Sequence, residues 1–184
     1  MSFYKKIADF LTWSRVFISL YFLYAGIFLK RDAFPWVVML VLYGWLSDAL
    51  DGEFARASGK KSWIGEHEAL VDIFFGTFLL FYLLLTRMVP FWIGVWVLIP
   101  GVLFLFKNSL HLGMLFMSLV YFILMLNIWF LGKWWLVPYG LYIVGALIFK
   151  WRRFKTQVHE FLGGFGLFKR EEKENSYTYE EKEC

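Results

Sequence analysis

Residues 110–131 read LHLGMLFMSLVYFILMLNIWFL, a stretch without Asp, Glu, Lys or Arg. About 20 consecutive apolar residues are enough for an α-helix to cross the hydrocarbon core of a bilayer. The rest of the chain has a similar character, since 60% of its 184 residues are hydrophobic and 23% are aromatic. A soluble domain of this length has too few charges to cover so much apolar surface. The sequence therefore predicts an integral membrane protein.

Six apolar segments lie between the clusters of charged residues. They cover residues 11–29, 34–49, 69–85, 89–106, 110–131 and 134–149. The connections are short, apart from the polar stretch 48–68, and short connections favour antiparallel neighbours. We therefore expect an all-α integral membrane domain of six transmembrane helices over residues 11–150.

The two ends of the chain differ from this domain. Residues 1–10 mix aromatic with basic residues and predict an interfacial amphipathic helix ahead of the first span. Residues 151–168 are basic and aromatic, and we expect them to lie at the membrane surface. Residues 169–184 are polar and dense in charge, which predicts a disordered tail.

The basic residues indicate the orientation of the chain. With a cytoplasmic N-terminus, the cytoplasmic side would hold Lys5, Lys6, Arg56, Lys60, Lys61, Lys107, Lys150, Arg152, Arg153 and Lys155, and the opposite side Lys30, Arg31, Arg87 and Lys133. This excess predicts a multi-pass protein of the cell membrane with both termini cytoplasmic. The net charge of +4 is no sign of nucleic-acid binding, because the basic residues lie at helix ends beside lipid headgroups.

The acidic residues gather in SDALDGEFARASGKKSWIGEHEALVD, residues 47–72. Asp48 and Asp51 are three residues apart at the end of the second segment, and Glu68 and Asp72 are four apart at the start of the third. Each pair shares one helix face. If these helices are antiparallel neighbours, four carboxylates converge on the cytoplasmic side. Ionised carboxylates there repel one another and are costly to desolvate, so we expect a bound hard cation such as Mg²⁺, Mn²⁺ or Ca²⁺.

The residues after Asp51 suit a phosphate-containing ligand. Gly52 has no Cβ and lets a flat group approach the helix, and Arg56 can offer a bidentate fork to a phosphate. Lys60, Lys61 and Ser62 add further donors. The pattern favours a pyrophosphate substrate that metal ions activate at phosphorus.

At these residues the chain resembles a known family. Asp48-x-x-Asp51-Gly52-x-x-Ala55-Arg56 resembles the first half of the signature of the CDP-alcohol phosphotransferases, also called CDP-alcohol phosphatidyltransferases, and matches it at all five positions. Gly65 follows at the family's spacing.

The second half of the signature departs from the family pattern. At the family's spacing, Ala69 and Ile73 stand where two aspartates belong, and neither side chain binds metal. A shift of one residue places Glu68 and Asp72 there, with Glu in place of Asp at the third acidic position. Leu11-Thr12-x-x-Arg15 is similar to the family's N-terminal pattern.

The resemblance implies a role for each matching residue. Two divalent ions, Mg²⁺ or Mn²⁺, would be held by Asp48, Asp51, Glu68 and Asp72. The CDP moiety would be lined by Gly52, Ala55, Arg56 and Ser62. Asp72 would also be the general base that takes the proton of the acceptor hydroxyl.

The activity that the resemblance implies is transfer of a phosphatidyl or similar group from a CDP-linked lipid donor, such as CDP-diacylglycerol, to a small alcohol. CMP is released, as in phospholipid biosynthesis. Glycerol 3-phosphate is the acceptor we expect for a chain of this length, and a homodimer is usual for the family. Two alternatives stay open, a non-catalytic relative that binds CDP-lipid and a metal-ion transporter. Transport is disfavoured by the scarcity of polar residues in the fourth and sixth segments.

Overall fold

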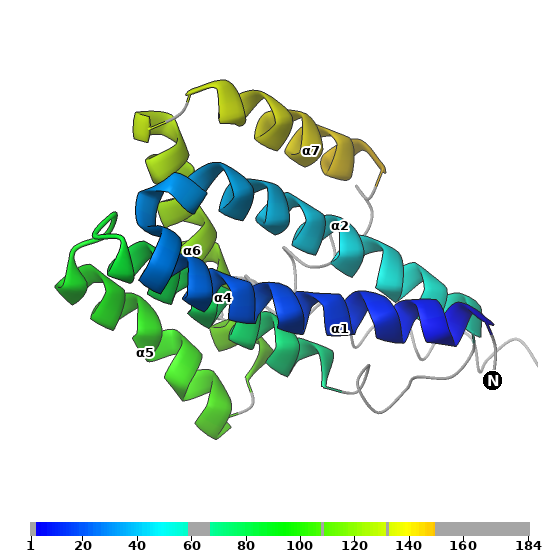
Figure 1. Cartoon of the computed structure of the whole chain (residues 1–184). Coiled ribbons are helices and arrows are strands. Elements are labelled where there is room, and N and C mark those ends of the chain that lie inside the picture. The colour runs from blue at the N-terminus through cyan, green and yellow to red at the C-terminus, as the bar shows by residue number, and fades with distance from the viewer. Residues whose placement is uncertain (1–2, 59–66, 108, 132, 150–184) are drawn as a thin grey trace, which may run out of the picture. The chain divides into compact units, whose positions relative to one another are not determined.

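The computed structural model describes residues 3–58, 67–107, 109–131 and 133–149, and for some residues inside the helices only the backbone. These residues form helices joined by short turns, with no strand among them, which confirms the all-α prediction (Figure 1). The chain divides into two compact units, Met1–Tyr142 and Ile143–Cys184. The first of these contains the packed helices discussed below.

Helices α1 (Phe3–Tyr24) and α2 (Phe34–Ser58) form an antiparallel hairpin (Figure 1). A π-helical turn over Ala25–Leu29 and a 3-10 turn over Lys30–Ala33 reverse the chain between them. Lys30 adopts a φ of 52°, and its carbonyl accepts a hydrogen bond of 3.0 Å from the Tyr82 hydroxyl. The reversal is therefore tied to the next helix of the chain.

Helix α4 (Glu68–Leu85) is followed by α5 (Phe91–Lys107), α6 (Leu110–Leu131), a 3-10 turn over Lys133–Trp135, and α7 (Leu136–Phe149). Helix α1 packs along both α2 and α4, α4 also packs on α6, and α5 packs on α6. The shared core is apolar and contains among others Phe22, Val37, Val41, Leu79, Phe116 and Leu124. Helix α1 is thus the element that joins the two helices that carry the acidic residues.

Much of the outer surface is apolar as well. Large side chains such as Phe17, Trp36, Trp96, Phe106 and Phe130 are more than half exposed. Soluble monomers rarely expose contiguous apolar patches larger than a few hundred Å². Such a surface is suited to contact with lipid chains.

Two stretches of the described residues are long and apolar enough to cross a membrane, Lys6–Asp51 and His111–Leu131. The first contains most of both α1 and α2, so it is a hairpin of two helices rather than one straight span. Ala69–Leu85 and Phe91–Lys107 are apolar but shorter. Six transmembrane helices therefore stay a prediction. The interfacial segment expected at residues 1–10 does too, and α1 passes through residue 10 without a break.

Helix α2 is longer than expected. The apolar pattern ends at residue 49, but the helix continues to Ser58. Residues 49–57 include Ala, Leu, Glu and Arg, which favour helix even where the segment is no longer apolar. Asp48 and Asp51 consequently lie inside the helix, about two turns before its end, and not at its terminus.

The Phe75 ring of α4 reaches Gly44 of α2. A Cβ built on Gly44 would lie 2.7 Å from Cζ of Phe75, whose side chain is buried in the core and packs edge-on against Phe22 at 5.1 Å. Gly44 lies one turn before Asp48, and Phe75 lies three residues after Asp72. The glycine therefore leaves room on α2 for a ring of α4 near the level of these two aspartates.

We expect Gly44→Ala to lower the melting temperature of the detergent-solubilised protein, because displacing a packed ring costs about 1–3 kcal/mol. Gly140→Ala is the matched control, since a Cβ there meets nothing within 4 Å. It should leave the melting temperature unchanged or raise it, because Ala favours helix over Gly by about 1 kcal/mol. Equal melting temperatures for the two variants would contradict the close contact.

Candidate active site between α1, α2 and α4

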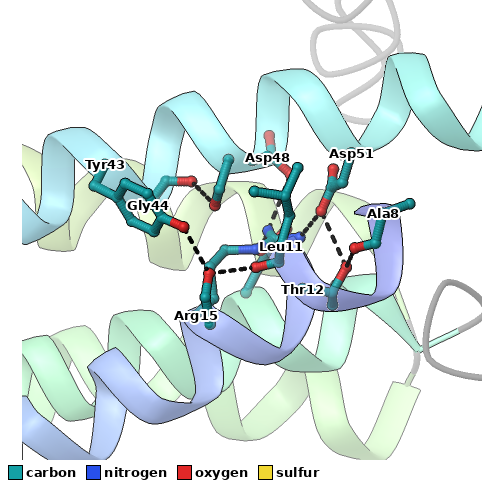
Figure 2. Close-up of polar contacts among 11 residues, drawn as sticks. Ala8, Leu11, Thr12, Arg15, Tyr43, Gly44, Asp48 and Asp51 are labelled. Carbon is teal, nitrogen blue, oxygen red and sulfur yellow. Dashed lines mark hydrogen bonds and ion pairs between the residues drawn. The ribbon is translucent and has the colours of Figure 1, made fainter. Parts of the chain in front are cut away.

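A buried arginine on α1 lies at the centre of the site. The side chain of Arg15 is only 2% exposed. Its Nη1 donates to Oδ1 of Asp48 at 3.1 Å and also to Oδ1 of Asp72, and its Nη2 donates to Oδ2 of Asp51 at 2.5 Å. Figure 2 shows the guanidinium facing the two aspartates of α2. One cation thus joins α1 to α2 and to α4.

Thr12, one turn before Arg15, makes a second contact from α1. Its hydroxyl is buried, 3.1 Å from Oδ2 of Asp51 and 3.1 Å from the carbonyl oxygen of Ala8 (Figure 2). Ser19, one turn after Arg15, donates to the Arg15 carbonyl at 2.7 Å. Thr12, Arg15 and Ser19 therefore share one polar face of an otherwise apolar helix, and that face turns toward the acids.

The three aspartates differ in their access to solvent. The Asp51 side chain is 4% exposed, whereas Asp72 is 34% and Asp48 is 47% exposed. Asp51 is therefore the inner carboxylate, held by both Arg15 and Thr12. Asp48 and Asp72 form the open side of the site.

The structure brings together Asp48, Asp51 and Asp72, three of the four acids that we expected to meet. Glu68 is the first residue of α4, one turn before Asp72, and its side chain is not among those described. Gly52, Ala55 and Arg56 lie on α2 after Asp51, where likewise only the backbone is described, and Ser62 lies outside the described residues. The roles of all these residues stay predictions.

No site role was predicted for Arg15 or Thr12, which matched only the family's N-terminal pattern. A signal was present in the sequence. Arg15 is the one charged residue of the apolar segment 11–29, and such residues inside a membrane-spanning helix usually have a function and a partner. The sequence did not identify the partners of Arg15, because the three acids lie 33, 36 and 57 residues away along the chain.

The donor chemistry of the site fits a hard divalent cation. Its acidic side chains offer carboxylate oxygens, the ligands that Mg²⁺ and Mn²⁺ prefer. Within residues 3–58, 67–107, 109–131 and 133–149, no three His, Cys, Asp or Glu side chains are grouped so that they could hold a metal as they stand. The aspartates contact the Arg15 guanidinium instead, so a cation would have to replace some of these contacts.

An aromatic cluster supports α2 beside the acids. Trp45, three residues before Asp48, packs against Tyr121 of α6 with ring centroids 4.8 Å apart, and against Tyr139 and Tyr142 at 4.8 and 5.5 Å. These contacts fix the rotation of α2 about its own axis. They help to keep Asp48 and Asp51 turned toward α1.

A family model described as CDP-alcohol phosphatidyltransferase matches residues 5–148. The match runs from the first turns of α1 to the last turn of α7 and covers well over half of the chain. It confirms the resemblance drawn from the motif at Asp48–Arg56. The comparisons with curated proteins and with solved structures found no match.

We expect Thr12→Val to lower the melting temperature by roughly 2–4 °C, because losing one buried hydrogen bond costs about 1 kcal/mol. Thr12→Ser should retain most of the stability, since it keeps the hydroxyl. Thr77→Val is the matched control, because the Thr77 hydroxyl bonds the Ile73 carbonyl of its own helix. A loss for Thr77→Val as large as that for Thr12→Val would show that the contact with Asp51 adds nothing.

Proposed function

Because the chain belongs to the CDP-alcohol phosphatidyltransferase family, we propose that it transfers a substituted phosphoryl group, a phosphatidyl group in particular, from a CDP-linked donor to an alcohol. CDP-diacylglycerol is the proposed donor, and CMP is the second product. The observation that carries the proposal is the meeting of Asp48, Asp51 and Asp72 in one site inside the matched region. The apolar helices and the family indicate a membrane protein.

Two divalent ions, Mg²⁺ or Mn²⁺, are proposed for the site, with Asp48, Asp51, Glu68 and Asp72 as their ligands. Such ions would neutralise charge on the diphosphate of the donor and make its phosphorus more electrophilic. The carboxylates that would hold them come from α2 and α4, which α1 holds together.

Asp72 is the proposed general base. It is partly open to solvent, so an acceptor hydroxyl can reach it. The acceptor oxygen attacks the phosphorus that is bonded to the lipid alcohol, the bond from that phosphorus to the CMP oxygen breaks, and Asp72 receives the hydroxyl proton. A carboxylate with a cation beside it is a weak base, so Asp72 acts mainly through its position, and the proton leaves late.

Gly52, Ala55, Arg56 and Ser62 are the proposed contacts for the CDP moiety. The first three follow Asp51 within the last turns of α2, next to the carboxylates in sequence. Arg56 suits the diphosphate because its planar fork binds two phosphate oxygens at once. The exposed apolar side chains of the surrounding helices suit the acyl chains of a lipid donor.

The remaining parts of the proposal follow from the charge distribution and the family. The excess of Lys and Arg supports a cytoplasmic active site and cytoplasmic termini in the cell membrane, the place where a water-soluble acceptor is available. Glycerol 3-phosphate is the acceptor we would test first, and a homodimer is the proposed assembly. The reaction would belong to phospholipid biosynthesis.

A second candidate is a relative that binds CDP-lipid without turnover. It is favoured by Glu68 at the third acidic position and by the motif's missing residue. The assay below separates the two candidates, because such a relative would bind the lipid and release no CMP.

We expect the purified protein to release CMP from CDP-diacylglycerol when Mg²⁺ or Mn²⁺ and an acceptor from a panel of alcohols are present. Asp72→Asn should lower the rate by about 10²–10⁴-fold, the usual contribution of a general base. Asp32→Asn is the control, since Asp32 is exposed in the 3-10 turn between α1 and α2. No metal-dependent release with any acceptor would overturn the proposed activity.

The assignment of Glu68 has its own test. Glu68→Gln should raise the Mg²⁺ concentration for half-maximal activity by at least about tenfold, because changing even an outer-shell partner of a metal ligand costs about 10–100-fold in affinity. Glu68→Asp should restore most of the affinity. A Mg²⁺ requirement that Glu68→Gln leaves unchanged would remove Glu68 from the ligand set.

A further inference from the structure

Three aspartates contact the Arg15 guanidinium. Among the contacts that the structure describes, three carboxylates therefore share one positive charge. The arginine keeps its charge at every physiological pH. With Arg15 in place the charge of these carboxylates is partly compensated, and without it they would repel one another across the site.

The contacts of the guanidinium fall into two groups. Nη2 binds the inner aspartate, Asp51, which Thr12 also holds. Nη1 binds the two outer aspartates, Asp48 and Asp72, which are 47% and 34% exposed. The Nη1 contacts are therefore the ones that a cation arriving from water reaches, while the Nη2 contact lies behind them.

We propose that Arg15 is a positioning residue, the resident counter-cation of the carboxylate site. It holds Asp48, Asp51 and Asp72 together while no metal ion is bound, and it competes with the divalent cation for the oxygens of Asp48 and Asp72. The anchor on Asp51 keeps Arg15 in the site throughout. The inference rests on the proposed function to the extent that it needs a divalent cation to bind these acids.

A purely structural role for Arg15 makes a different prediction. If Arg15 only joined α1, α2 and α4, its removal would lower the stability of the protein equally with and without metal. If Arg15 is a counter-cation, its removal lowers the stability mainly when metal is absent, since a divalent ion supplies the positive charge that the arginine had supplied. Stability and metal affinity measured without substrate therefore distinguish the two roles.

The experiment uses the full-length chain in detergent and Arg15→Met, which keeps an apolar stem without charge. We expect its melting temperature to fall well below that of the wild type in EDTA and to recover most of the loss in millimolar Mn²⁺. We also expect free-Mn²⁺ measurements by electron paramagnetic resonance to show about tenfold tighter binding by the variant, because a competing positive charge has been removed.

Arg31→Met is the matched control. Arg31 is also an arginine that joins two parts of the bundle, but its Nε and Nη2 donate to the backbone carbonyls of Thr86 and Arg87 at 3.1 and 3.2 Å. Its loss should lower the melting temperature by the same amount in EDTA and in Mn²⁺, and should leave the Mn²⁺ affinity unchanged.

Arg15→Lys keeps the test decisive should Arg15→Met fail to fold. A single ammonium cannot reproduce the fork that contacts three acids, so this variant should bind Mn²⁺ a few-fold more tightly than the wild type. Its melting temperature in EDTA should lie closer to that of the wild type than the melting temperature of Arg15→Met does. Wild-type Mn²⁺ affinity in every folded Arg15 variant would overturn the proposal. If the wild type also releases CMP, only the role of Arg15 falls, whereas a wild type that neither binds Mn²⁺ nor releases CMP removes the proposed function as well.

Discussion

The positive charge of Arg15 is the constraint on which the rest of the site depends. An arginine cannot lose its proton under physiological conditions, and an unpaired charge among apolar helices is costly. Helix α1 carries that charge at a position that is only 2% exposed. Acids from α2 and α4 must therefore reach it, and this requirement sets the register of all three helices at the level of the site.

Other contacts allow the helices to meet this requirement. Gly44 leaves room for Phe75, so that this ring of α4 packs on α2 near the level of Asp48 and Asp72. Trp45, the next residue on α2, packs on tyrosines of α6 and α7. A glycine contact on one face and an aromatic cluster on another hold α2 in one orientation. The electrostatic and the apolar contacts thus favour the same arrangement.

Periodicity and spacing were sufficient to predict the helical class, the approximate bounds of the helices after residue 67, and three of the acids that meet. Asp48 and Asp51 follow an i, i+3 spacing, and such local rules act within one helix. The central role of Arg15 could not be predicted in this way, because its partners lie on other helices and a pattern along one segment carries no information about pairing between segments. The predicted end of α2 was also wrong, because the apolar pattern stops at residue 49, while helix-favouring residues continue the helix to Ser58.

The unequal exposure of the three aspartates gives the site an open end, here called the mouth, and a closed end, here called the base. Asp48 and Asp72 stand at the mouth, and Asp51 lies at the base with 4% of its side chain exposed. A cation that enters from water would pass the outer pair before it meets Asp51, and it would leave in the reverse order. How quickly the site exchanges its contents is therefore decided at the mouth. Any preference among the cations that reach the base would depend on Asp51, which Arg15 and Thr12 both contact.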